Sequence, residues 1–165
     1  MKLIGLLSDT HSYLHPRVKH HFEKCDEIWH AGDIGNLALA DELATFKPFR
    51  AVYGNIDGDS IRKEYPLHSK FELEGVKVWI THIGGYPNRY RPEILSELKR
   101  DAPDLFICGH SHILKAMPDK QFKMLHLNPG ACGKVGFHQV LTLMRFQLDK
   151  GTVQNLEVIE LEKRV

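Results

Sequence analysis

The sequence predicts an α/β fold in which two β-sheets pack face to face at the centre and helices flank them. Three observations lead to this prediction. Short apolar runs rich in β-branched residues recur along the chain and end in polar or glycine-rich turns. Segments with apolar residues at helical spacing lie between several of these runs in the first two-thirds of the chain. The last third contains only strand-like runs joined by turns.

Strands alternate with helices in the first two-thirds of the predicted fold. We expect buried strands at residues 2–7, 27–30, 49–53, 76–81 and 105–108. Another strand, at 67–73, is expected to pair with the one that begins at Val76, through a turn at Glu74-Gly75. The alternation predicts parallel pairing of the buried strands.

Two helices and four further strands complete the prediction. A helix is expected over 36–46, with Asn36 as its N-cap, and another over 92–100, with Pro92 in its first turn. The strands of the last third are expected at 113–117, 124–127, 139–148 and 153–162, and the last two form a hairpin. Because no internal repeat or linker interrupts the chain, we expect a single domain over residues 1–165.

The composition is that of an ordinary soluble globular protein. Of the 165 residues, 42% are hydrophobic and 26% are charged, and the formal net charge is +1. This near-neutral balance offers no broad basic surface for a nucleic-acid backbone. No apolar stretch approaches the roughly 20 residues that a membrane-spanning helix needs. We therefore expect neither nucleic acid nor a membrane as the partner.

Two features predict a cytoplasmic location. The first apolar run, residues 2–7, is followed at once by Ser8-Asp9, so it is too short for the apolar segment of a signal peptide. The three cysteines, Cys25, Cys108 and Cys132, lie far apart and do not have the spacing of a zinc ribbon. Reduced thiols in a cytoplasm explain them most simply.

Potential metal ligands follow five of the predicted strands. The chain has eleven histidines, and histidine is the commonest protein ligand of transition metals. Asp, His or Asn side chains stand at the ends of these strands: Asp9, His11, Asp33, Asn55, His82, His110 and His112. In α/β proteins, bound molecules and ions lie outside the carboxyl ends of the strands. We therefore expect these side chains to converge at one edge of the sheets.

The number and type of these side chains predict two metal ions. Seven ligands are too many for one tetrahedral ion, but they suit two ions that share a bridging carboxylate. A mixture of carboxylate and imidazole favours manganese, iron or zinc over calcium or magnesium. Taken singly, Asp33 could be a helix cap, and Asn55 and His82 could be structural. If all these residues were structural, potential metal ligands would have to occur by coincidence at five separate strand ends. A shared metal site is therefore the better interpretation.

The ordered motif DxH, GD, GN, H and GHxH resembles the calcineurin-like metallophosphoesterase superfamily. The SDTH start, the GNID block and Asn128-Pro129-Gly130 resemble the small YfcE-type phosphodiesterases within it. The resemblance runs from Lys2 to about Gly130. Each piece is weak alone, but the ordered set is highly specific.

The resemblance implies a role for every one of the seven positions. Asp9, His11 and His112 would bind one ion, Asn55, His82 and His110 the other, and Asp33 would bridge the two. In this family a bridging hydroxide attacks phosphorus, and the metals polarise the phosphoryl oxygens. The cofactor expected is a pair of divalent ions, manganese first, with iron, zinc or nickel as alternatives.

One position departs from the pattern of many superfamily phosphatases, which have a histidine directly after the GN asparagine. Here Ile56 occupies that place, and isoleucine cannot protonate a leaving group. YfcE-type members also lack this histidine. The general acid stays open between Asp57 and His11, or the substrate needs a good leaving group. Asp57 is expected more as a carboxylate that orients a ligand histidine. The candidate catalytic residues are thus Asp33, Asn55, His11 and Asp57.

The leading function is hydrolysis of small phosphodiesters, with two alternatives. One is a phosphomonoesterase, and the other is a non-catalytic, protein-binding scaffold of the Vps29 type, which has an incomplete ligand set. Self-association into a homo-oligomer also stays open. Candidate substrate contacts are Arg62, Tyr86, Arg89 and Ser111. The histidines that match no metal position are expected at the surface: His15, His20, His21, His68 and His138.

Overall fold

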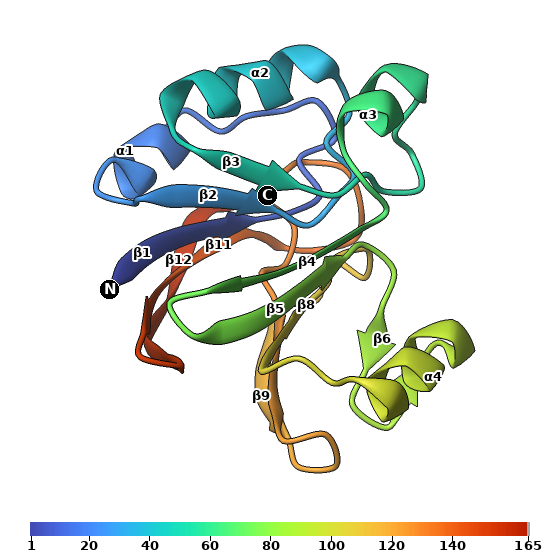
Figure 1. The fold of residues 1–165 in the computed structure, drawn as a ribbon. Helices are drawn as coiled ribbons and strands as arrows, with labels where there is room; N and C mark the ends of the chain where they lie inside the picture. The colour runs from blue at the N-terminus through green and yellow to red at the C-terminus, as the bar shows by residue number, and fades with distance from the viewer. Residues whose placement is uncertain (165) are drawn as a thin grey trace.

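Two five-stranded sheets form the centre of the protein in the computed structural model, which describes residues 1–164. The first has the order β12-β11-β1-β2-β3 and consists of Thr152–Lys163, Val140–Asp149, Lys2–Leu7, Glu27–His30 and Phe49–Ala51. The second has the order β4-β5-β8-β10-β9 and consists of His68–Leu73, Val76–Thr81, Leu105–Ile107, Met124–Asn128 and Lys115–Asp119. Figure 1 shows the two sheets lying against each other.

Both sheets are mixed and contain three neighbouring parallel strands. In the first sheet β1, β2 and β3 run parallel, and β11 joins β1 from the other side in the antiparallel direction. In the second, β5, β8 and β10 run parallel, while β4 and β9 are antiparallel edge strands. The predicted parallel pairing is therefore confirmed, and so is the hairpin of β11 with β12.

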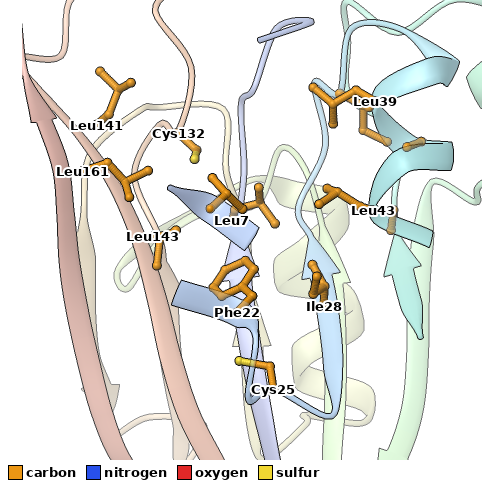
Figure 2. Close-up of a cluster of buried hydrophobic side chains, with 14 of the residues drawn as sticks. Leu7, Phe22, Cys25, Ile28, Leu39, Leu43, Cys132, Leu141, Leu143 and Leu161 are labelled. Carbon is orange, nitrogen blue, oxygen red and sulfur yellow. The ribbon is translucent and has the colours of Figure 1, made fainter. Parts of the chain in front are cut away.

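The period-two alternation of β1 explains the layers. Ile4 and Leu6 are fully buried and pack against Val78 and Ile80 of the second sheet. Leu7 points to the opposite face, where helices α1 (Val18–Phe22) and α2 (Leu37–Phe46) cover the first sheet. Figure 2 shows this cluster between α2 and the strands of the first sheet. A side chain at Gly5 would come within 2.6 Å of the Phe22 ring, so α1 packs directly onto the strand backbone.

Helix α4 (Pro92–Arg100) and a small hairpin cover part of the second sheet. The helix packs Ile94 and Leu98 against Trp79 and Phe106. Beside it lies the hairpin of β6 (Gly85–Tyr86) and β7 (Arg89–Tyr90), seen in Figure 1 next to α4. Across the described residues, no helix is both long and apolar enough to cross a membrane.

The structure confirms the predicted fold class and differs from the sequence prediction in five short elements. Helices α1 and α3 (Asp59–Glu64) were not predicted, because each spans fewer than two turns and shows almost no periodicity. The hairpin of β6 and β7 was not predicted either. The strand predicted at 113–117 begins instead at Lys115, because Ile113 and Leu114 belong to an exposed turn.

Candidate metal centre

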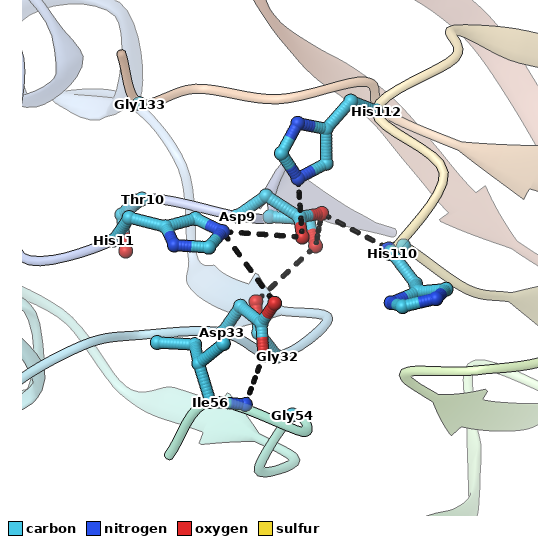
Figure 3. A network of polar contacts seen from close by, with 12 residues as sticks. Asp9, Thr10, His11, Gly32, Asp33, Gly54, Ile56, His110, His112 and Gly133 are labelled. Atoms are coloured by element: carbon cyan, nitrogen blue, oxygen red, sulfur yellow. Dashed lines mark hydrogen bonds and ion pairs between the residues drawn. The ribbon is translucent and has the colours of Figure 1, made fainter. Parts of the chain in front are cut away.

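The seven predicted ligands lie on turns at the carboxyl ends of strands from both sheets. The ends of β1, β2 and β3 supply the Asp9, Asp33 and Asn55 regions, and those of β5 and β8 supply His82 and the segment with His110 and His112. Two clusters of three residues bring their ligand atoms within 4.8 Å of one another: Asp9 with His11 and His112, and Asp33 with His82 and His110. Figure 3 shows most of these side chains facing one another.

Sharp turns after the strands aim these side chains inward. Five of the residues have left-handed backbone: Asp9 (φ 54°), His11 (45°), Asp33 (55°), His110 (69°) and His112 (61°). Asp, Asn and His adopt this region more readily than most residues do, but a cluster of them is uncommon and often marks a functional site. Glycine is also required beside the ligands, since a side chain at Gly54 would overlap Oδ1 of Asp33.

Asp9 has one oxygen that is fixed and one that is free. Its Oδ2 accepts hydrogen bonds from the Ser8 hydroxyl (2.7 Å) and from the His110 backbone N–H (3.1 Å). Its Oδ1 faces Nε2 of three histidines, at 3.2 Å for His112, 3.8 Å for His82 and 3.9 Å for His11. The carboxylate is therefore fixed by the protein on one side and points its other oxygen at three imidazoles.

Asp33 lies between the two clusters. Its Oδ2 is 3.2 Å from Nε2 of His82 and 3.4 Å from Nε2 of His11, which belongs to the other cluster. Its Oδ1 accepts the backbone N–H of Ile56 at 3.1 Å. Burial raises the pKa of Asp33, but the adjacent His82 imidazole, with the Ile56 N–H bond, outweighs burial and lowers the pKa below its usual value.

The tautomer of His82 is set by its second ring nitrogen. Nδ1 lies 2.7 Å from the Ala31 carbonyl oxygen, which can only accept, so Nδ1 must carry the proton. In the neutral ring Nε2, which lies 3.2 Å from Asp33, then keeps a lone pair that could bind a metal ion. Asn55 lies at the open side of the same cluster, with Oδ1 3.0 Å from Nδ1 of His110.

The orphaned atoms of the site fit bound metal ions. Oδ1 of Asp9, Nε2 of His11 and Nε2 of His82 are buried and have no hydrogen-bond partner. Polar atoms buried in this way are costly, and native proteins rarely leave them unpaired. All three belong to the two clusters and are of the types that divalent transition metals bind. Cations in both clusters would satisfy them.

Asp57 has a different role from the two expected for it. The side chain is 2% exposed, and its carboxylate accepts the backbone N–H groups of Gly54 (2.8 Å), Ile34 (3.1 Å) and Gly35 (2.8 Å). These are bonds to backbone, not to a ligand histidine, and they leave the carboxylate enclosed. We correct both expectations: Asp57 fastens the turn that carries Asn55 to the turn that carries Asp33.

His30 was missed in the sequence and supports two of the ligand turns. Nδ1 accepts the Gly32 N–H at 3.1 Å, so Nε2 carries the proton and donates to the Thr10 hydroxyl at 2.9 Å. Thr10 in turn donates to the Ile34 carbonyl at 2.9 Å. Burial lowers the pKa of His30 to about 4, so the ring is neutral near pH 7. Its position at the end of a buried strand was the only signal in the sequence.

The expectation that the remaining histidines lie at the surface is only partly correct. His20 and His68 are exposed, whereas His15 is 8% exposed and His21 is half-buried. His138 is also half-buried, and its Nδ1 lies 3.3 Å from Nδ1 of His112, one of the predicted ligands.

Two of the four predicted substrate contacts, Ser111 and Arg62, bond to neighbouring segments of the chain. Ser111 accepts hydrogen bonds from Nδ2 of Asn128 (3.1 Å) and from the Ile113 N–H (3.2 Å). Asn128 also donates to the Gly109 carbonyl at 3.0 Å. Arg62 stacks on the Tyr53 ring at 4.6 Å and donates to the Asp57 carbonyl. Tyr86 and Arg89 belong to the β6–β7 hairpin.

Two hollows open beside the second cluster. One, of about 300 Å³, is lined by Asn55 and His82 together with Tyr53, Arg62 and Leu67. The other, of about 180 Å³, is lined by His110 and Ser111 with the glycines and Tyr86 of the hairpin segment. Ile83 and Arg91 line both hollows and thus stand between them.

Comparisons with known proteins agree with this geometry. Residues 1–151 match the family model described as the calcineurin-like phosphoesterase superfamily domain. A probable metallophosphoesterase of Methanothermobacter thermautotrophicus is 32% identical over 136 residues, which cover 78% of this chain and 76% of the relative.

Solved structures share the fold. An archaeal phosphodiesterase superposes with a TM-score of 0.77 at 24% identity and covers 96% of this chain and 99% of its own. Vps29 of Entamoeba histolytica in complex with zinc superposes with a TM-score of 0.71 at 18% identity, covering 96% of this chain and 98% of its own. From the family match and the curated relative, we conclude that the chain belongs to the calcineurin-like phosphoesterase superfamily.

Proposed function

We propose that this protein is a dinuclear, metal-dependent phosphodiesterase. The observation that carries the proposal is the pair of three-residue clusters joined by Asp33. This residue belongs to the second cluster, and its Oδ2 lies 3.2 Å from His82 of the same cluster and 3.4 Å from His11 of the first. A carboxylate in that position is suited to bridge two cations. A structural role alone does not explain three buried ligand atoms that lack partners.

The proposed ligand sets follow the two clusters. Asp9, His11 and His112 hold one ion, Asn55, His82 and His110 hold the other, and Asp33 bridges them. Manganese is the proposed metal, and iron, zinc and nickel suit the same nitrogen and oxygen donors. When bound, such a pair supplies a water nucleophile at neutral pH and stabilises negative charge on phosphoryl oxygens.

The chain itself positions these groups and supplies little acid catalysis. The hydrogen bond from the Ile56 N–H to Asp33 orients the bridging carboxylate, and Asn55 stands at the open side, where substrate enters. The Ile56 side chain, which is 46% exposed, stands where many members of the superfamily have a histidine, and it cannot protonate a leaving group. His11, half-buried within the first cluster, is the remaining candidate acid, so we expect dependence on the quality of the leaving group.

The two hollows favour a diester over a monoester. A phosphodiester has two organic groups on phosphorus, and the hollows beside Asn55 and beside His110 provide space on two sides of the second cluster. The larger hollow has an aromatic ring and the Arg62 guanidinium in its lining, which suits a flat or anionic group. A phosphomonoester would leave one of the hollows empty.

A second candidate function is that of a protein-binding scaffold. The fold likeness to Vps29 and the exposed apolar side chains Val135 (54% exposed) and Phe137 (100% exposed) favour it. The seven complete ligand positions favour catalysis instead.

Hydrolysis of bis(4-nitrophenyl) phosphate and of 4-nitrophenyl phosphate, with manganese and with chelator, tests the proposal. We expect manganese-dependent turnover of the diester that exceeds turnover of the monoester and is lost in the Asp33→Asn variant. Turnover of neither ester by protein with two bound ions would favour the scaffold. Faster turnover of the monoester would identify a phosphomonoesterase.

The setting of this activity is also a proposal. We infer one metallophosphoesterase domain over residues 1–165 in the cytoplasm. The three cysteines are free and buried, which suits a reducing compartment, and burial raises the pKa of Cys25 to about 11 and keeps that thiol protonated. Self-association stays a prediction that the mass of the purified protein in solution tests.

A further inference from the structure

His138 lies outside every motif of the family pattern, yet it contacts a ligand of the first cluster. Its Nδ1 is 3.3 Å from Nδ1 of His112, and the two ring centroids are 5.1 Å apart at an angle of 76°. On the opposite edge of the His112 ring, Nε2 faces Oδ1 of Asp9 at 3.2 Å, as Figure 3 shows. His112 is thus held between His138 and the cluster.

The other ring nitrogen of His138 determines how the two imidazoles bond. Nε2 of His138 lies 2.7 Å from the Gly133 carbonyl oxygen, which only accepts, so Nε2 carries the proton. In a neutral ring Nδ1 is then an acceptor, and the hydrogen of this pair must come from Nδ1 of His112. His112 with its proton on Nδ1 keeps the lone pair of Nε2 free, on the side of Asp9.

The segment that carries His138 is tied to the site and to the edge of the first sheet. Gly133 donates its backbone N–H to the Asp9 carbonyl at 3.1 Å. Nη1 of Arg164, next to the end of β12, donates to the carbonyls of Gly136 and His138, both at 2.8 Å. Gly136 has a φ of +122°, and a side chain there would overlap the His112 ring. The backbone is therefore shaped to bring His138 against His112.

We propose that His138 is a positioning residue, which fixes the tautomer and ring orientation of His112 so that Nε2 binds the ion of the first cluster. The inference rests on the proposed dinuclear site. Metal-binding histidines commonly donate their second N–H to a fixed acceptor, and loss of that acceptor typically costs 10–100-fold in metal affinity. Here the acceptor is a second imidazole, itself oriented by the Gly133 carbonyl.

The test compares two replacements of His138. In His138→Asn the amide oxygen stands near the place of Nδ1 and can still accept from His112, whereas His138→Leu has no acceptor. His20→Leu serves as the histidine control, because His20 is exposed on α1, and Phe137→Ala serves as the control within the same segment. Manganese binding is titrated by calorimetry, and the melting temperature of each protein is measured in chelator.

We expect the wild-type chain to bind two manganese ions. In His138→Leu the affinity of one site for manganese should be about 10–100-fold lower, while the affinity of the second site stays within a few-fold of wild type. His138→Asn should recover most of the loss, and both controls should bind as wild type does. Equal affinities in wild type and His138→Leu would overturn the inference. A melting temperature in chelator lowered equally in both variants, with both sites weakened alike, would also overturn it in favour of packing. Wild type that binds fewer than two ions would instead contradict the proposed function.

Discussion

Nε2 of His82 lies 3.2 Å from Oδ2 of Asp33, so an imidazole and a carboxylate of the second cluster face each other directly. Burial lowers the pKa of His82, but the adjacent Asp33 carboxylate and the charge of Asp9 outweigh it and raise the pKa above its usual value. The adjacent imidazole thus offsets the cost of burying the Asp33 carboxylate. A metal ion between the two atoms would replace that compensation.

Asp33→Asn should abolish turnover and weaken both metal sites, because a neutral amide bridges two cations poorly. In chelator the melting temperature should fall by a few degrees at most, since the pairing with His82 is lost while the oxygen of the new amide can still accept the Ile56 N–H. With manganese the wild type should gain stability by mass action and the variant much less. Thermal melts in both conditions measure this. An equal manganese-induced rise in the two proteins would falsify the bridging role.

Gly54→Ala should reduce metal binding at both sites, because the added methyl group would overlap Oδ1 of Asp33 and displace the carboxylate. Gly58→Ala is the matched control, since a side chain at Gly58 meets no atom within 4 Å. Metal content after reconstitution with manganese, together with a circular-dichroism melt, measures both variants. Full occupancy by two ions in Gly54→Ala would mean that Asp33 can move without consequence, contrary to the proposed bridge.

Asp57→Asn should destabilise the protein by about 2–4 kcal/mol even in chelator, because an amide cannot accept all three backbone N–H groups. For a chain of this size, this corresponds to roughly 4–16 °C in melting temperature. Asp59→Asn, an exposed residue in the first turn of α3, should change little. Equal melting temperatures for Asp57→Asn and wild type in chelator would contradict the fastening role.

Stability should fall with acid between about pH 6.5 and pH 4. Burial lowers the pKa of His30 and of His126 to about 4, so the unfolded chain binds protons that the folded protein does not. Each of the two histidines should lower the free energy of unfolding by about 2 kcal/mol between pH 7 and pH 5. Above the ordinary histidine pKa this contribution is fully present. Urea titrations in chelator measure it. His126→Leu should lose less over this interval than wild type and the His20→Leu control, and three equal losses would contradict the prediction.

Wild-type turnover should fall steeply as the pKa of the leaving group rises, since Ile56 stands where a proton donor is expected. Ile56→His should speed hydrolysis of alkyl diesters by at least about 10-fold, a part of what a well-placed general acid contributes. Val158→His, a similarly exposed position on β12, should have no effect. The rates are measured across a series of aryl and alkyl diesters. A flat dependence in wild type, with chemistry rate-limiting, would mean that another residue supplies the proton.

The sequence predicts the strands and the convergence of the ligands because both depend on local pattern. Strands have an apolar run, a polar turn marks each end, and parallel strands place their ends together. Asn36 was predicted as the cap of α2, and its side chain accepts the Leu39 N–H at 2.8 Å. Asp33 is therefore not needed as that cap.

The parts that escaped prediction depend on contacts between distant turns. The carboxylate of Asp57 bonds to groups 22 and 23 residues earlier, and His138 meets a ring 26 residues away. No periodicity encodes such pairs, because they follow from the path of irregular backbone. Strand β9 also begins two residues later than predicted. The backbone is left-handed at His112, and the two apolar residues that follow His112 lie before the strand.

The order of strands in the first sheet has a consequence for protein synthesis. Strand β1, which leads into Asp9 and His11, is completed on one side by β11, whose residues pair with it as Lys2 with Leu148 and Leu6 with Met144. On the ribosome, β1 therefore waits with one edge uncovered until most of the chain has been made. Unpaired apolar edges of this kind are prone to aggregation. We expect the first sheet to form late during translation, and nascent chains that stop before β11 to depend on chaperones for solubility.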